Sequence, residues 1–265
     1  MNYKTILLHV DQSGDNARRL AVAARLATAF DAHLIGTAAV GLSRFAAPGT
    51  NRGGPPAAWA PQLAMLTARA HAALDGFEQD CTQRGIPSWE RRLAADDGEG
   101  TLLLQSGYTD LLVLGPPGTG PDAVQPAEVI LAVARPVLLV PKAGADACLA
   151  RILVAWDASA PALRALVAAM PLLQRAATVT LWTWGAAGDR EMVAYLARQR
   201  VTAKVAAAGG EGRAVACGLA LLEAARGADL VVMGAYGHSR LREFVLGGVT
   251  RAMLAALPVP VLLHQ

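Results

Sequence analysis

Glycines gather near the end of the chain at a spacing that suits the binding of an anion. An apolar run ends at Gly234, and Gly237 closes the turn that follows it. Gly247 and Gly248 then open a second apolar segment, with Thr250 close behind. Glycines let backbone N–H groups approach an anion, and the start of a helix adds partial positive charge. A strand, a glycine turn and a helix in this order therefore predict a phosphate site.

Length and composition limit what kind of molecule can carry this site. The chain has 265 residues, enough for two domains of about 130 residues, and 54% of them are hydrophobic. The net charge is only +3 and no block of like charge occurs, which speaks against nucleic acid as a partner. The longest apolar runs are too short to span a membrane. We expect a protein of the cytoplasm.

The cysteines give no sign of a metal site or a disulfide framework. Cys81, Cys148 and Cys217 lie far apart and form no Cys-x-x-Cys pair. This pattern is typical of thiols in a reducing compartment. No metal site is predicted.

An internal repeat reveals the organisation of the chain. The segment from Lys4 to Asp11 reappears from Ala150 to Asp157, and the segment from Thr109 to Gly115 reappears from Ala228 to Gly234. Arg135-Pro136 and the apolar run after it return as Val259-Pro260. Repeats at this distance indicate two domains, which we place at residues 1–145 and 146–265.

Each half alternates apolar β-runs with Ala- and Leu-rich segments of helical spacing. Ala17 to Phe30 is the first such helix, His33 to Ala38 the next strand, and Pro161 to Leu173 the matching helix of the second half. Strands that are apolar on both faces and separated by helices indicate parallel β-α units. The predicted fold class is α/β, with two tandem doubly wound domains of about five parallel strands each.

The two halves differ in their connections. The matching residues Asp11 and Asp157 are 146 positions apart, but the matching glycines Gly115 and Gly234 are only 119 positions apart. The first half therefore carries about 27 extra residues between these points. The Gly- and Pro-rich stretch from Gly41 to Pro61 is the natural place for them, and we predict a long surface loop there. This loop either has no part in function or serves as a lid or an interface element.

The first half has lost most of its glycine motif. Its turn survives as Gly115-Pro-Pro-Gly118, but Ala123 to Pro126 stand where the second half has Gly247 to Thr250. Prolines also remove N–H donors from the turn. The first half is therefore predicted to be a scaffold without a phosphate site, in which Asp11 caps the helix that follows it. Similarly, Asp96 and Asp97 are predicted to open the helix around Thr101 to Ser106.

The spacing Gly-x2-Gly-x9-Gly resembles the nucleotide loop of the universal stress protein (UspA) family. The resemblance covers nearly the whole chain and implies two UspA-like domains, of the adenine nucleotide alpha hydrolase-like type, whose final strands pair to give a pseudo-dimer. It implies ATP or AMP as ligand, with or without Mg²⁺. The predicted contacts are Ala155, Trp156, Asp157, Trp184, Met233, Gly234, Gly237, His238, Arg240, Gly247, Gly248, Val249 and Thr250.

Several of these residues have a second interpretation. Asp157 either accepts hydrogen bonds from the ribose hydroxyls or caps the following helix. Gly234 either admits phosphate oxygens or only permits close packing of a strand on a helix. Trp156 and Trp184 either stack on the base or fill the pocket. Gly248 stands where many family members have Ser or Thr, which predicts weaker phosphate binding.

The function predicted from these residues is nucleotide-dependent regulation in a stress response, without fast turnover. No P-loop, no Gly-x-Ser-x-Gly motif and no general base placed to activate a water is found in the sequence. The alternatives are a nucleotide-free scaffold in which both sites are degenerate, and a slow ATPase or autokinase. A homodimer and an unidentified protein partner are compatible with either the binding protein or the scaffold.

Overall fold

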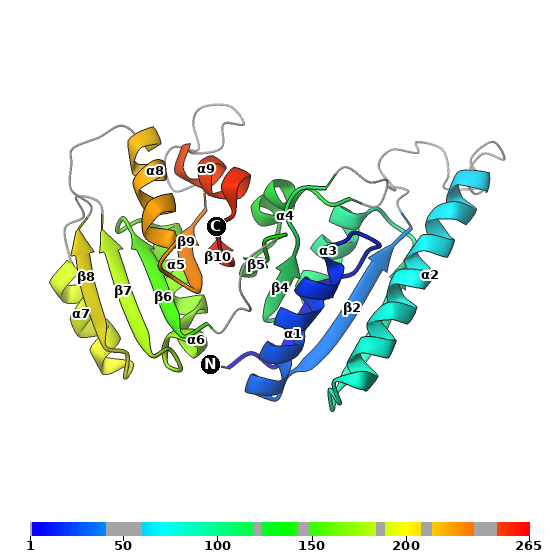
Figure 1. Cartoon of the computed structure of the whole chain (residues 1–265), viewed down its shortest axis with the longest axis horizontal. Helices are drawn as coiled ribbons and strands as arrows, with labels where there is room; N and C mark the ends of the chain where they lie inside the picture. Colours follow the sequence, from blue (N-terminus) through cyan, green and yellow to red (C-terminus); the bar gives the residue numbers. More distant parts are fainter. Residues whose placement is uncertain are drawn as a thin grey trace. The chain divides into compact units, whose positions relative to one another are not determined.

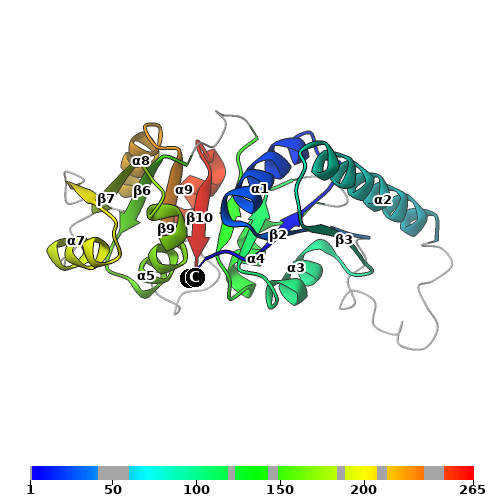
Figure 2. The ribbon, with the colours of Figure 1, turned by 90° about the horizontal axis from the view of Figure 1, so that it is seen from below.

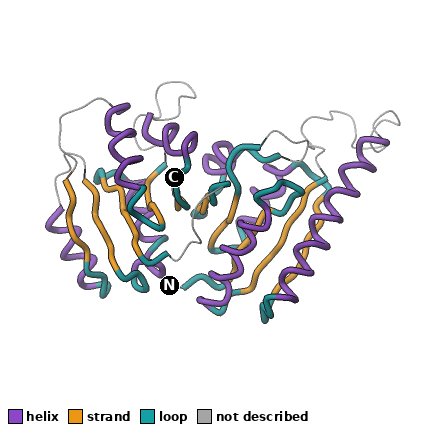
Figure 3. Tube along the Cα trace, in the orientation of Figure 1, coloured by secondary structure: helices purple, strands orange, loops and turns teal. Residues whose placement is uncertain are grey.

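The computed structural model describes residues 2–40, 60–118, 123–142, 149–183, 189–207, 214–235 and 248–265. Strands and helices alternate along these residues, as Figure 3 shows. They form two compact units, one of Tyr3–Arg135 and the other mainly of Pro136–Gln265. Among the described residues, none of the helices combines the length and the apolar character needed to cross a membrane.

The unit Tyr3–Arg135 is built on parallel strands in the order β3-β2-β1-β4. β1 is buried along nearly its whole length, which explains its continuous apolar sequence. Figure 2 shows helices on both faces of this sheet. The elements are β1 (Thr5–His9), α1 (Asn16–Phe30), β2 (His33–Ala39), α2 (Ala60–Gln83), β3 (Trp89–Ala94), α3 (Gly98–Ser106), β4 (Leu111–Leu114) and α4 (Pro126–Ala132).

The unit Pro136–Gln265 holds strands in the order β5-β10-β9-β6-β7-β8. α5 and α7 cover one face of its sheet and α8 and α9 the other (Figure 2). Its elements are β5 (Val137–Leu139), β6 (Arg151–Trp156), α5 (Ala160–Ala168), α6 (Met170–Leu173), β7 (Thr178–Thr183), α7 (Asp189–Arg198), β8 (Ala203–Ala207), α8 (Ala214–Ala225), β9 (Leu230–Gly234), α9 (Gly248–Ala256) and β10 (Val261–His264).

The strands of this second sheet are parallel with one exception. β5 runs antiparallel to β10, with Val261 opposite Leu139 and Leu263 opposite Val137. The last strand before the second repeat therefore pairs with the last strand of the chain, as the family resemblance implies. This pairing explains why Pro136 and the residues after it join the carboxyl-terminal unit.

The repeat extends to individual hydrogen bonds at the amino ends of the strands. Oδ2 of Asp110 accepts the backbone N–H groups of Lys4 and Thr5, at 2.8 and 3.0 Å. Oδ2 of Asp229 accepts those of Ala150 and Arg151 in the same way, at 3.1 and 2.8 Å. The two carboxylates thus fix the start of the first strand of each half.

The sequence predicts most element positions well, and one detail differs. Asp97 is the N-cap of α3, with its carboxylate accepting the Gly100 N–H at 2.6 Å, which confirms the predicted helix start. The predicted loop 41–61 is shorter than expected, because Ala60 and Pro61 already belong to α2. A proline fits there because the first turn of a helix needs no N–H donor. Residues 41–59 lie outside the described residues.

Candidate functional site

The carboxyl ends of β6 and β9 form the edge at which the predicted contacts meet. The two strands are parallel neighbours, with Ala155 opposite Met233. From β6 the chain proceeds to β7 and β8 on one side, and later to β9 and β10 on the other side. Ligands of open α/β sheets bind where the strand order reverses in this way. The first part of the predicted contact set therefore lies at the switch point of the sheet.

Asp157 follows β6 directly and lies at the surface of this edge. Its Oδ1 accepts the N–H of Ser159 at 2.9 Å. Ser159, not Asp157, is the N-cap of α5, because its Oγ accepts the Ala162 N–H at 3.2 Å. The helix-cap interpretation of Asp157 is therefore wrong, and the exposed carboxylate is placed where a ribose could meet it.

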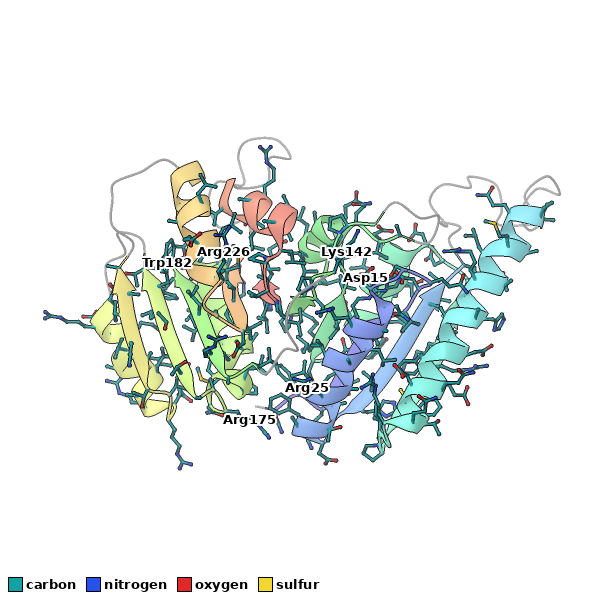
Figure 4. The ribbon with its side chains drawn as sticks, viewed as in Figure 1. Asp15, Arg25, Lys142, Arg175, Trp182 and Arg226 are labelled. Atoms are coloured by element: carbon teal, nitrogen blue, oxygen red, sulfur yellow. The ribbon has the colours of Figure 1, made fainter. Side chains whose placement is uncertain are left out.

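Trp156 lies beside Thr183 in the register of β6 and β7 and is only 7% exposed. Its Nε1–H is buried, and it has no hydrogen-bond acceptor in the part of the chain that the structure describes. A buried donor without an acceptor costs free energy. Trp156 therefore fills space next to the carboxyl edge of the sheet, and its indole N–H is unpaired among the described residues. Trp182 of β7, labelled in Figure 4, is equally buried at 7%.

Gly234 ends β9 against the start of α5. A Cβ at this position would lie 2.5 Å from the Ala162 nitrogen and 2.7 Å from the Pro161 carbonyl carbon. Contacts this short with backbone atoms leave no room for a side chain. Close packing of β9 on α5 is thus sufficient to explain why position 234 is a glycine. Gly234 is therefore weak evidence for a phosphate site.

The amino end of α9 supplies the remaining described contacts. β9 and β10 are parallel, so α9 must carry the chain back from the carboxyl edge of the sheet. Its first residues, Gly248 and Val249, are partly exposed, whereas Thr250 is buried. Backbone N–H groups in the first turn of a helix have no partner within the helix. They are therefore the groups that could hold an anion here.

Gly218 of α8 positions this helix start, and the sequence interpretation overlooked it. A Cβ on Gly218 would lie 3.2 Å from the Cβ of Ala252 and 3.5 Å from the Cα of Val249. The glycine thus lets α8 pack closely against the first turns of α9. A glycine within an Ala- and Leu-rich helix is the signal that could have revealed this role.

Cys217, next to Gly218, also belongs to the surroundings of the edge. Burial raises the pKa of its thiol, and the negative charge of Asp157 raises the pKa further. The thiol is thus held in its neutral form. Cys217 and Cys81 are free cysteines, and no group of three metal-ligating side chains occurs among the described residues.

Five predicted contacts cannot be placed. These are Trp184, Gly237, His238, Arg240 and Gly247, which lie outside the described residues.

The first half differs from the prediction at Asp11. The N-cap position of α1 is Asp15, whose side chain makes no capping hydrogen bond, so the predicted cap role of Asp11 is wrong. Oδ1 of Asp11 instead accepts the Ser13 N–H at 2.9 Å and a hydrogen bond from Nη2 of Arg19 at 2.5 Å. The carboxylate of Asp11 therefore forms an ion pair with a buried arginine.

Comparison with known proteins agrees with this fold. The universal stress protein family model matches residues 149–264. A universal stress protein from Archaeoglobus fulgidus DSM 4304 superposes with a TM-score of 0.73 at 17% identity, covering 98% of each chain. A protein of unknown function from Pseudomonas aeruginosa PAO1 superposes with a TM-score of 0.61 at 14% identity, covering 99% of this chain and 92% of its own. At these identities the likeness concerns the fold. A search of curated proteins returned no match.

Proposed function

We propose that residues 149–264, the part of the chain that matches the universal stress protein family model, bind an adenine nucleotide, AMP or ATP. The observation that carries the proposal is that Asp157 follows β6 directly, while α9 comes after β9, the parallel neighbour of β6 at the switch point of the sheet. Asp157 offers a carboxylate for hydroxyl groups, and the start of α9 offers backbone N–H donors for an anion. A ribose phosphate needs both kinds of group.

Each described residue has a distinct part in this proposal. The carboxylate of Asp157 accepts hydrogen bonds from the ribose, and the backbone at Ala155 and Met233 faces the base. The backbone N–H groups of Gly248 and Val249 hold the phosphate. Further contacts are proposed, on the sequence pattern alone, for Trp184, Gly237, His238, Arg240, Gly247 and Thr250.

We propose binding without fast turnover, so that the nucleotide sets a conformation or a partner surface used in a stress response. The domains would be residues 1–145 and 146–265, forming a pseudo-dimer within the chain. The antiparallel pairing of β5 with β10 supports this arrangement. Mg²⁺ would be held through the phosphates, since the described residues contain no group of metal ligands for it.

Calorimetric titration of the full chain tests the proposal. AMP, ATP and ATP with Mg²⁺ are titrated separately, and adenosine is included to separate the contribution of the phosphate. The Asp157→Asn variant should lose about tenfold or more in affinity, because a hydrogen bond to a charged group contributes about 1.5–3 kcal/mol. Asp31→Asn, an exposed carboxylate of the other unit, is the matched control and should bind as the wild type does.

A nucleotide-free scaffold is the second candidate, and the burial of Trp156 favours it. An indole that is 7% exposed fills the space next to the edge instead of offering a face to a base. Under this alternative, none of the nucleotides gives heat at millimolar concentration, and Asp157→Asn has no effect on any ligand. The same titration therefore decides between the two candidates.

A further inference from the structure

A buried arginine lies over the glycine turn of the amino-terminal unit. Arg19 of α1 is 3% exposed. A Cβ on Gly115, the residue that follows β4, would lie 2.6 Å from Arg19 Nη1 and 2.8 Å from Asp15 Oδ2. The end of β4 is thus covered by a guanidinium and a carboxylate. Figure 4 labels Asp15 near the amino end of α1.

The guanidinium is fixed by several oxygen atoms. Its Nη2 donates to Asp11 Oδ1 at 2.5 Å, to Ser13 Oγ at 3.0 Å and to Asn16 Oδ1 at 3.3 Å. His9 is also buried, with Nδ1 3.8 Å from Asp11 Oδ2. A charged hydrogen-bond network of this kind, out of contact with water, holds one geometry.

The carboxyl-terminal unit is built differently at the equivalent place. Gly234 corresponds to Gly115 and Asp157 to Asp11, and the same repeat places Ala165 where the first half has Arg19. Ala165 is fully buried and too short to reach the strand edge. Gly234 instead touches the backbone of Pro161 and Ala162 directly. Among the described residues, the nearest side-chain atom to a Cβ at this position would be the Pro161 Cβ, at 2.9 Å, so the start of α5 itself covers the end of β9 where a charged pair covers the end of β4.

We propose that the amino-terminal unit is closed by its own side chain: the Arg19 guanidinium occupies the site over Gly115 as a built-in ligand. An incoming phosphate would meet the carboxylates of Asp11 and Asp15 at this edge. It would also lack two donors, because Pro116 and Pro117 have no N–H. This inference does not depend on whether the carboxyl-terminal unit binds a nucleotide.

Chemical rescue of Arg19→Ala in the full chain tests the inference. The variant should melt at a lower temperature than the wild type and should bind ethylguanidinium, which restores the missing atoms. Ligand at about ten times its dissociation constant should raise the melting temperature by about 3 °C. Ethylammonium should raise it less, because it lacks the planar fork of donors.

Arg25→Ala is the matched control, since Arg25 is an exposed arginine of the same helix. Neither Arg25→Ala nor the wild type should respond to ethylguanidinium. An equal response in Arg25→Ala, or no response in a folded Arg19→Ala, overturns the inference.

A second measurement decides the matter if Arg19→Ala does not fold. In the wild-type chain, the side-chain N–H signals of Arg19 should be resolved in ¹⁵N-correlated NMR spectra and exchange slowly with water, because the guanidinium is buried and hydrogen-bonded. Arg19→Lys identifies these signals by their loss. Arg19 signals that are averaged and exchange as fast as those of Arg25 would show that the site is open.

Discussion

Gly234 and Ala162 are so close that a Cβ on Gly234 would lie 2.5 Å from the Ala162 nitrogen. The residue that begins the nucleotide motif is thus also a packing contact between β9 and α5. A substitution at Gly234 changes the fold before it changes any ligand contact. Binding experiments should therefore rely on Asp157 and on the surroundings of α9.

Gly234→Ala should lower the free energy of unfolding by about 1–3 kcal/mol, because the new methyl group meets backbone atoms that cannot rotate away. Urea unfolding measures the change. Gly227→Ala is the control in the same unit, since a Cβ there would meet only the Ala224 carbonyl oxygen, at 3.7 Å. Equal losses in the two variants would contradict the packing argument.

Gly218→Val should separate α8 from the first turns of α9. The added side chain must displace Ala252 and Val249, so we expect a loss of about 1–2 kcal/mol in stability and weaker AMP binding. Leu219→Val puts the same residue at the next helix position, where the side chain is 63% exposed, and controls for helix propensity. AMP affinity that is unchanged in a folded Gly218→Val protein argues against α9 as the phosphate site.

Trp156→Phe should cost little stability, or even increase it. The truncation leaves a small cavity, but it also removes a buried Nε1–H that has no acceptor among the described residues. The same change at Trp182, which is equally buried but whose Nε1 is not among the buried unpaired atoms of the described residues, should cost about 1 kcal/mol or more. If urea unfolding gives the two variants the same loss, the indole of Trp156 has a partner that this structure does not show.

Acid should weaken the amino-terminal unit through Asp11. Burial raises the pKa of Asp11, but the charge and hydrogen bond of Arg19, together with His9 and Ser13, outweigh burial and hold the pKa below its ordinary value. The unfolded-state pKa is about 3.9, so this stabilisation is complete above that pH and is lost as the pH falls through the folded-state value. Unfolding free energies measured between about pH 2 and 6 should therefore fall less steeply for Asp11→Asn than for the wild type.

Asp11→Asn should in addition lower the stability at neutral pH by about 3 kcal/mol, because Arg19 remains buried without its counter-charge. The exposed pair of Lys4 with Asp31 provides the comparison, and Asp31→Asn should change the stability by less than about 0.5 kcal/mol. An Asp11→Asn protein as stable as Asp31→Asn would show that the Asp11–Arg19 pair contributes no net stabilisation.

The fold could be predicted from the sequence because the repeat and the apolar runs report it directly. Buried parallel strands must be apolar throughout, and Asp110 and Asp229 mark the same turn in each half. Local chemistry was harder to predict. Asp157 and Ser159 are both good capping residues, and only the geometry shows that Ser159 accepts the helix N–H. Arg19 could not have been identified, because arginine is rarely buried and its partners are known only once the chain has folded.

NMR titration of the ¹⁵N-labelled full chain with AMP is the most direct test of the proposed site. The account predicts saturable shifts of the backbone amide signals of Asp157, Met233 and Val249, with none at Asp11 or Gly115. Amide signals that do not move at millimolar AMP, or that move only in Tyr3–Arg135, would contradict it.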